Sequence, residues 1–365
     1  MGNVISKSTN FPPELVTEVF DLVRGKSTLA RLSRQEPVSF TDTDYFTFQM
    51  DGEASLVGEN GQKVNGGASL VPVTVKAYKI EYGVRVSDEF MIASEERRMD
   101  ILRTFRDGFA KKAARALDMM AFAKVNPKTG ATASQIDNDF TTVTNRVLHT
   151  PGDTSTNIND AALLIGDYDM TGLALSKTLA AEMATEVNSQ GIKIYPELEW
   201  GRSPENLRGI PCDVNATVNK YGTALGIVGD FDCFKWGFAK DIEATVIPYG
   251  DPDNSGVDLA GSNQVYIRCE AYIGFAVLDK NAFARIETPY AVKYDGNGAD
   301  GGTAVADTVG MAGEAVEIAS NTFTKTGKTF SGWNTAADGS GTSYAAGASY
   351  TLTSAGLKLY AQWAS

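Results

Sequence analysis

Two strand-like segments near the start of the chain, joined by a stretch dense in glycine and asparagine, most constrain its fold. Residues 40–50 and 71–82 are rich in aromatic and β-branched residues, and the second segment partly alternates apolar with polar positions. Residues 51–67 concentrate Gly and Asn, which readily adopt the positive φ angles of turns. The pattern predicts a β-hairpin too long to be stable alone in water. We expect it to lie against another subunit.

The end of the chain differs in composition from the rest. Beyond Arg285 there is no Arg, His or Cys, while Gly and Thr become dense. We expect residues 288–365 to form a small β module on a few large aromatic anchors. Its predicted core is Phe330, Trp333, Tyr344, Tyr360 and Trp363. The module offers no cluster of acid, base or nucleophile, which favours a display or interaction role.

Candidate chemical groups are few and scattered. A sole histidine, His149, excludes a metal site built from several histidines, and we expect it to be a loop residue. The three cysteines stand far apart, at Cys212, Cys233 and Cys269. Carboxylate pairs such as Asp167 and Asp169 are common in turns, and the run from Asp251 lacks the terminal Glu of a calcium loop. We therefore assign no catalytic, metal-binding or cofactor-binding residue and expect no enzyme.

Charge and length bound the class of protein. The net charge of -12 disfavours a protein that grips nucleic acid, although one that only encloses it remains compatible. No apolar run approaches the roughly 20 residues of a membrane span, so no membrane partner is expected. With 365 residues, the chain is long enough for two or three domains.

A long amphipathic helix is predicted after Ser94. Apolar residues recur every three or four positions between Met99 and Met120. Basic residues fill the other positions: Arg97, Arg98, Arg103, Arg106, Lys111, Lys112 and Arg115. We interpret these bases as a solvated face, with a surface towards enclosed nucleic acid as the alternative. Beyond residue 155, short helices alternate with strands at 173–175, 224–228, 242–247 and 265–277, which predicts an α+β fold.

The order of these parts resembles the major capsid proteins of tailed bacteriophages, with the Hong Kong 97-type shell fold. The motifs that carry the resemblance are residues 11–16, 51–54, 58–61, 207–211, 229–231 and 282–284. It implies six regions: an N-terminal arm (1–36), an extended loop (37–85), a peripheral domain with a spine helix (86–154), an axial domain (155–245), return strands (246–287) and a surface module (288–365). The implied inter-subunit contacts lie in the extended loop, at Asp51, Gly58, Asn60, Gly61 and Lys63.

The tail is similar to the Listeria–Bacteroides repeat, a β-grasp-like module of bacterial surfaces. Residues 291–298, 323–334, 339–344 and 359–363 carry this similarity, in a single copy.

Together the two resemblances imply a structural head protein. It would form hexamers and pentamers of an icosahedral shell with a scaffolding protein and a portal, and enclose double-stranded DNA without sequence-specific binding. The module would project outward, where its alternative roles are to decorate the surface, to clamp neighbouring subunits or to bind a bacterial surface ligand. The location of the head protein would be the virion, after assembly in the host cytoplasm. The alternatives are an encapsulin-type compartment shell and a surface adhesin.

Overall fold

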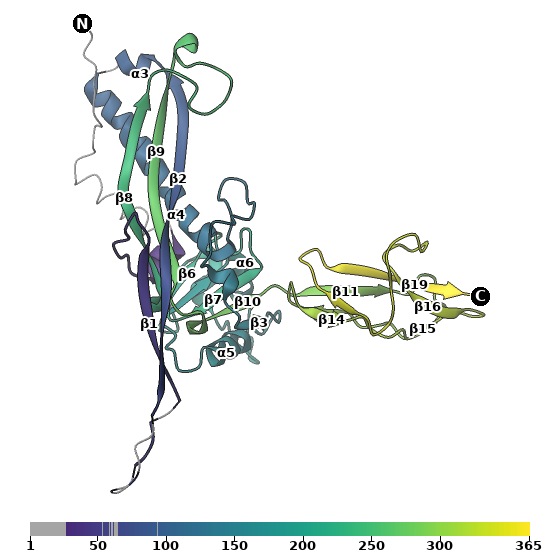
Figure 1. The fold of residues 1–365 in the computed structure, drawn as a ribbon. Helices are drawn as coiled ribbons and strands as arrows, with labels where there is room; N and C mark the ends of the chain where they lie inside the picture. Colours follow the sequence, from purple (N-terminus) through teal and green to yellow (C-terminus); the bar gives the residue numbers. More distant parts are fainter. Residues whose placement is uncertain (1–26, 53, 58, 60, 62–64, 93) are drawn as a thin grey trace.

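A computed structural model of the chain describes residues 27–52, 54–57, 59, 61, 65–92 and 94–365. They form an elongated body, a hairpin that projects from it (purple) and a strand-rich module at its side (yellow) (Figure 1). Helices and strands are mixed throughout the body, so the expected α+β class is confirmed. Most of the predicted N-terminal arm, residues 1–26, lies outside the described residues.

A four-stranded antiparallel sheet forms the long axis of the body, in the order β1-β2-β9-β8. Its strands are β1 (Thr43–Asp51), β2 (Gly67–Ser87), β8 (Phe234–Ile247) and β9 (Gln264–Val277). Strand β2 pairs with β1 up to Val75, and from Lys76 onwards it pairs with β9. The hairpin therefore continues directly into the sheet of the body, and residues 76–85 belong to that sheet.

Helix α4 (Glu95–Ala123) runs along this sheet, after the short helix α3 (Glu89–Ile92). Ser94 caps α4 by accepting a hydrogen bond from the Arg97 amide, as expected. Arg106 is a correction, because its side chain is buried and pairs with Asp107 at 2.9 Å. It lies one turn from Phe109 and so falls within the apolar stripe. None of the described helices is both long and apolar enough to cross a membrane.

A six-stranded sheet forms the compact part of the body, in the order β3-β10-β7-β4-β6-β5. The strands are β3 (Arg146–Leu148), β4 (Gly172–Leu175), β5 (Asn206–Leu207), β6 (Ile210–Val214), β7 (Ala224–Gly229) and β10 (Phe283–Glu287). Ala174 and Ile227 face the cluster around α4, whereas Leu175 and Val228 face α5 (Thr154–Leu164) and α6 (Lys177–Met183). Both faces of the sheet are therefore covered, which explains why β4 and β7 consist almost entirely of apolar residues and glycine.

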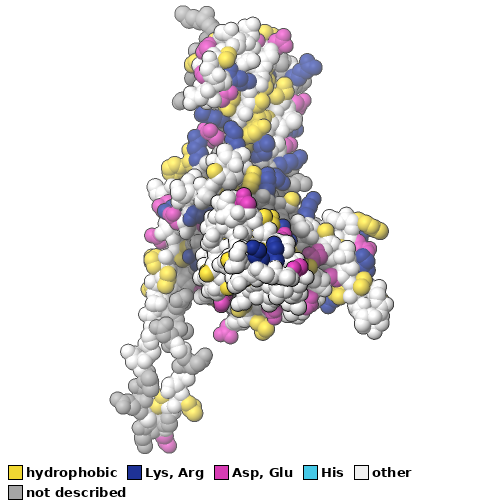
Figure 2. Space-filling model, turned by 90° about the vertical axis from the view of Figure 1, so that its right-hand side faces the viewer, with side chains coloured by type: hydrophobic (Ala, Val, Ile, Leu, Met, Phe, Trp, Pro, Cys, Tyr) yellow, Lys and Arg dark blue, Asp and Glu magenta, His cyan; other side chains and the backbone are white. Residues whose placement is uncertain are grey.

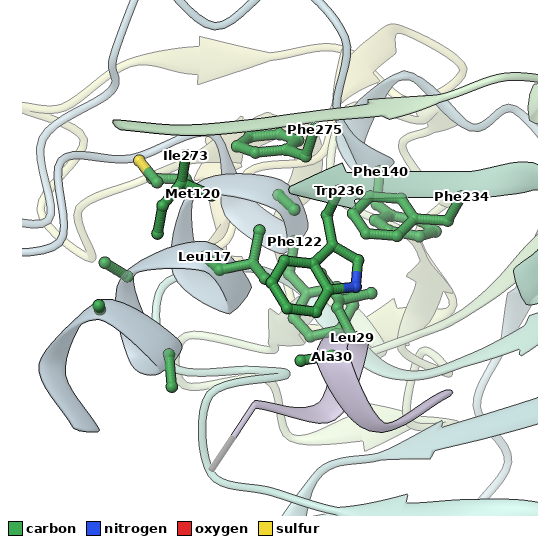
Figure 3. Close-up of a cluster of buried hydrophobic side chains, with 14 of the residues drawn as sticks. Leu29, Ala30, Leu117, Met120, Phe122, Phe140, Phe234, Trp236, Ile273 and Phe275 are labelled. Atoms are coloured by element: carbon green, nitrogen blue, oxygen red, sulfur yellow. The ribbon is translucent and has the colours of Figure 1, made fainter. Parts of the chain in front are cut away.

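One buried cluster joins the arm to the body (Figure 3). Leu29 and Ala30 of α2 (Thr28–Leu32) lie near Trp236 of β8 and Phe122 of α4. The short 3-10 helices are η1 (Phe140–Thr142), η2 (Pro196–Gly201), η3 (Phe231–Cys233), η4 (Ala260–Ser262) and η5 (Lys280–Ala282).

The module contains a five-stranded sheet in the order β13-β11-β19-β16-β17 and two short ribbons, β12–β15 and β14–β18. The sheet strands are β11 (Tyr290–Asp295), β13 (Thr308–Gly310), β16 (Thr329–Asn334), β17 (Ser343–Tyr344) and β19 (Leu357–Ala364). The ribbon strands are β12 (Gly301–Gly302), β14 (Ala315–Glu317), β15 (Phe323–Thr324) and β18 (Ser349–Thr351). Two residues, Thr288 and Pro289, connect β10 to β11.

Candidate functional site

The β1–β2 hairpin carries exposed apolar side chains on one face. Phe46 lies opposite Pro72, and Leu70 is two residues from Pro72, so the three share this face. Phe46 is 65% exposed and Leu70 is 63% exposed. On the other face, Tyr45 and Val73 pack near the base of the hairpin. An exposed apolar stripe on a two-stranded ribbon is typical of a surface that another protein covers.

The predicted contact residues lie at the far end of this hairpin. Asp51 ends β1 opposite Gly67, and Gly61 is exposed in the connection. Gly52, beside Asp51, has a φ of 79°, a value that favours glycine. The other three predicted contacts, Gly58, Asn60 and Lys63, lie outside the described residues.

A buried aspartate of α4 holds the end of the arm. Asp118 accepts hydrogen bonds from the hydroxyls of Ser27 and Thr217, the latter at 2.6 Å, and from the amides of Thr28 (3.0 Å) and Leu29 (3.2 Å). Burial raises the pKa of Asp118 to about 6, although the four hydrogen bonds favour its charged form. The first turn of α2 is therefore capped by a side chain from a distant helix.

A second carboxylate fixes the same segment to the six-stranded sheet. Asp213 of β6 accepts hydrogen bonds from the Thr28 hydroxyl at 2.6 Å and from the Arg31 guanidinium at 2.7 Å. Neither aspartate is among the residues predicted from the sequence. One sequence feature could have indicated Asp118: it lies among apolar residues of the helix. A carboxylate is rarely buried there unless it has a partner.

The basic residues of α4 are mostly solvated. Arg97, Arg103, Lys111 and Lys112 are exposed, and the Lys112 amine lies 4.4 Å from the ring centre of Tyr82. Figure 2 shows Lys and Arg side chains along the elongated upper part of the body. This agrees with the predicted solvated face.

The groups weighed for catalysis have structural surroundings instead. The ring nitrogens of His149 lie 2.9 Å from the amide oxygen of Asn157 and 3.0 Å from the Glu182 carboxylate, which joins the end of β3 to α5 and α6. Burial raises the pKa of the Cys212 and Cys269 thiols to about 12 each, so neither is a reactive thiolate at neutral pH. Among the described residues, no group of three or more His, Cys, Asp or Glu side chains could hold a metal ion.

The aspartates weighed as calcium ligands surround a guanidinium group. Nη2 of Arg85 lies 2.8 Å from Asp251 Oδ1, 2.5 Å from Asp253 Oδ1 and 2.9 Å from the Val257 carbonyl oxygen. Hydrogen bonding to Arg85 holds the pKa of Asp253 well below its usual range. The Arg85 side chain of β2 thus holds the loop between β8 and β9. Arg85 lies too far from this loop in the sequence for the contact to be predicted.

Trp333 lies at the centre of the module. It is fully buried, and its indole N–H donates a hydrogen bond to the Ala319 carbonyl at 2.9 Å. Its ring centre lies 4.9 Å from that of Tyr294 and 5.1 Å from that of Phe330. Such close aromatic pairs add stability beyond the area they bury.

The other predicted aromatic residues lie around this centre, with one difference. Tyr344 and Trp363 are partly buried against the Trp333 cluster. Tyr360 is half-buried outside that cluster, with the Lys358 amine 4.7 Å from its ring centre. Neighbouring residues of a strand point to opposite faces, and Leu359 takes the buried position on β19.

The module contacts the body beside its short connection. Arg146 of β3 donates a hydrogen bond to the Ala312 carbonyl of the module at 2.7 Å. Its Nε lies 3.7 Å from the buried Glu287 carboxylate, which also pairs with Arg285 at 3.1 Å. The Thr288 amide donates to the Thr223 carbonyl at 2.9 Å. Both sides of the connection are therefore anchored to the body.

Comparisons with known proteins match these two parts separately. Residues 10–288 match the phage capsid family, and residues 290–362 match the Listeria-Bacteroides repeat domain. The major capsid protein of Staphylococcus phage 80alpha is 25% identical over 283 residues, which cover 75% of this chain and 83% of that protein.

Solved structures share the fold of the body. A chain from Mycobacterium phage Ogopogo has a TM-score of 0.63 and 32% identity, over 72% of this chain and 92% of that chain. A chain from the capsid of an empty GTA particle computed with C5 symmetry has a TM-score of 0.54 and 15% identity, over 79% and 95% of the two chains. The expected capsid fold is confirmed, and the compartment and adhesin alternatives are not favoured. The chain belongs to the phage capsid family: it is a structural major capsid protein, not an enzyme, with a Listeria-Bacteroides repeat domain at its C-terminus.

Proposed function

We propose that copies of this chain form the hexamers and pentamers of an icosahedral phage head around double-stranded DNA. Capsid relatives assemble shells from copies of themselves, which supports this role. Assembly would take place in the host cytoplasm, with a scaffolding protein and a portal. The net charge of -12 favours enclosure of DNA over tight, sequence-specific binding.

The exposed apolar face of the β1–β2 hairpin carries this proposal. Phe46 and Leu70 are each about two-thirds exposed in a single copy. Covering both by a neighbouring copy contributes about 2–4 kcal/mol per hairpin, or about a 30- to 1,000-fold change in an association constant. Each shell would repeat this contact in every subunit, so a modest local contribution is multiplied by symmetry.

A double substitution on this face tests the proposal. Phe46→Ser with Leu70→Ser removes apolar surface that is mostly exposed within a single copy, so the melting temperature should stay close to that of wild type. Particle yield with a scaffolding protein, measured by sedimentation and electron microscopy, should fall steeply. Ser69→Thr, also exposed on the hairpin, is the matched control. Normal particles from the double variant would contradict the proposal.

The regional roles follow the same proposal. Residues 1–36 would serve as the arm and 37–85 as the extended loop, with the predicted contacts around Asp51 and Gly61 near its tip. Residues 86–154 and 246–287 would form the peripheral domain, and 155–245 the axial domain. The module at 288–365 would project from the outer surface and bind a bacterial surface ligand, since the interior is needed for DNA.

A further inference from the structure

Trp200 is an exposed indole on strained backbone. It is 88% exposed, and its φ and ψ of 58° and 29° place it in the left-handed region. Bulky side chains rarely adopt this conformation, and such strain persists where the surrounding structure enforces it, often at functional sites. An aromatic side chain held in water at such a position indicates a binding role.

Buried residues just before Trp200 anchor its turn to the body. Tyr195 and Leu198, which precede Trp200 in the chain, are buried, and the Tyr195 hydroxyl lies 2.6 Å from the Ser155 hydroxyl of α5. The guanidinium carbon of Arg202 lies 5.7 Å from the indole ring centre. Trp and Arg are the residue types most enriched among the side chains that dominate protein interfaces.

A second apolar patch lies at the opposite edge of the six-stranded sheet. Leu163 is 78% exposed, Leu164 beside it is exposed, and the acidic residues Asp167 and Asp169 follow on the surface. The Leu164 carbonyl accepts a hydrogen bond from the side chain of Asn145, next to the edge strand β3.

Trp200 lies towards the other edge. The chain after it passes Ser203, whose hydroxyl donates to Asp213 at the end of β6, close to the other edge strand, β5. The two exposed patches therefore lie towards opposite edges of the sheet.

We propose that Trp200 and Arg202 of one copy dock against Leu163, Leu164 and the adjacent aspartates of the next copy. A head-to-tail contact that closes a ring needs two different patches on one subunit, and these two edges supply them. Arg202 supplies the positive charge that would face the aspartates of the next copy. This complementarity is confined to Arg202, because the nearby Glu197 and Glu205 are acidic. The inference rests on the proposed self-assembly and names the residues that would form one of its contacts.

Trp200→Gly separates the role of the indole from folding. Glycine adopts the left-handed region without strain, so the melting temperature of the free copy should equal or exceed that of wild type. Assembly should need at least tenfold more protein. Trp200→Phe should recover much of the lost assembly, and Val309→Ser, at an exposed apolar site of the module, should assemble like wild type. A Trp200→Gly variant that assembles like wild type, or melts lower, overturns the inference.

Disulfide trapping tests the pairing of the patches. Copies with Trp200→Cys and copies with Leu163→Cys, mixed under mild oxidation, should give more cross-linked heterodimer than either variant gives homodimer. Homodimers of Trp200→Cys alone, or no cross-link, would overturn the head-to-tail contact. If wild-type protein forms no particles, the proposed function fails. The cross-linking result still tests whether Trp200 of one copy contacts Leu163 of another. If wild type assembles but the heterodimer is absent, only this inference fails.

Discussion

Replacing Asp118 by Asn should remove a pH dependence from the folding of the capsid body. Burial raises the pKa of Asp118 from 3.8 to about 6, which corresponds to about 3 kcal/mol of stability. The folded state thus binds this proton more tightly than the unfolded state. Below about pH 4, Asp118 is protonated in both states and hardly lowers the free energy of unfolding. As pH rises to about 6 its buried charge lowers this free energy progressively, and above that the loss stays constant.

The Asn variant has no such proton, but it disturbs the cap of α2. In the wild type, both carboxylate oxygens accept hydrogen bonds. In the variant, an NH2 group replaces one of these oxygens and cannot accept, and each buried donor left unpaired costs about 1–3 kcal/mol. At pH 7 this loss is offset by the removal of the buried charge, so the two proteins should have similar stability. On lowering the pH from 7 to 4, the wild type should gain about 2 kcal/mol of stability relative to the Asn variant.

Urea unfolding of unassembled protein between pH 4 and 7 measures this difference. Hydrogen exchange of peptides covering residues 27–33 and 113–122 reports the body without interference from the module. Asp100→Asn, at an exposed position of the same helix, should follow wild type at every pH. A difference between wild type and Asp118→Asn that is constant with pH, or that grows as pH rises, would refute the assignment of a raised pKa.

Four further outcomes test other parts of the account. Trp333→Ala should destabilise the module by about 3–5 kcal/mol and leave the melting of the body unchanged in calorimetry, whereas loss of both transitions would contradict two separate cores. Arg85→Ala should speed proteolysis within residues 250–263, because Asp251 and Asp253 lose their shared partner; an unchanged cleavage rate would count against the ion cluster. In the wild type this loop should loosen as pH falls through the lowered pKa of Asp253, since its stabilisation exists only above the ordinary Asp pKa. Deletion of residues 288–365 should leave particle assembly intact in electron micrographs, and insoluble protein would mean that the module holds the shell together.

Periodic segments could be predicted from the sequence because local rules govern them. Ser94 marks the start of α4, and the apolar spacing of that helix identifies its buried face from Leu102 onwards. The strand at 265–277 also matches β9 closely. Strand β8 begins eight residues earlier than predicted, at Phe234, because Lys235 and the glycine at 237 interrupt the apolar pattern while the pairing with β9 continues.

The side-chain contacts that fix the arm could not be predicted in this way. Asp118 and Asp213 lie 90 and 185 residues from Thr28 in the sequence, and nothing in their local spacing indicates that partner. The same holds for Arg85 and the loop at Asp251. The strained turn at Trp200 was also missed, since its backbone conformation depends on the packing of Leu198 beneath it.

Cryo-electron microscopy of assembled particles tests the central claim most directly. The account predicts that the hairpin formed by β1 and the first part of β2 lies across a neighbouring copy, with Phe46 and Leu70 covered there. A map in which this hairpin folds back onto its own copy, or in which both side chains stay exposed to solvent within the shell, would contradict it.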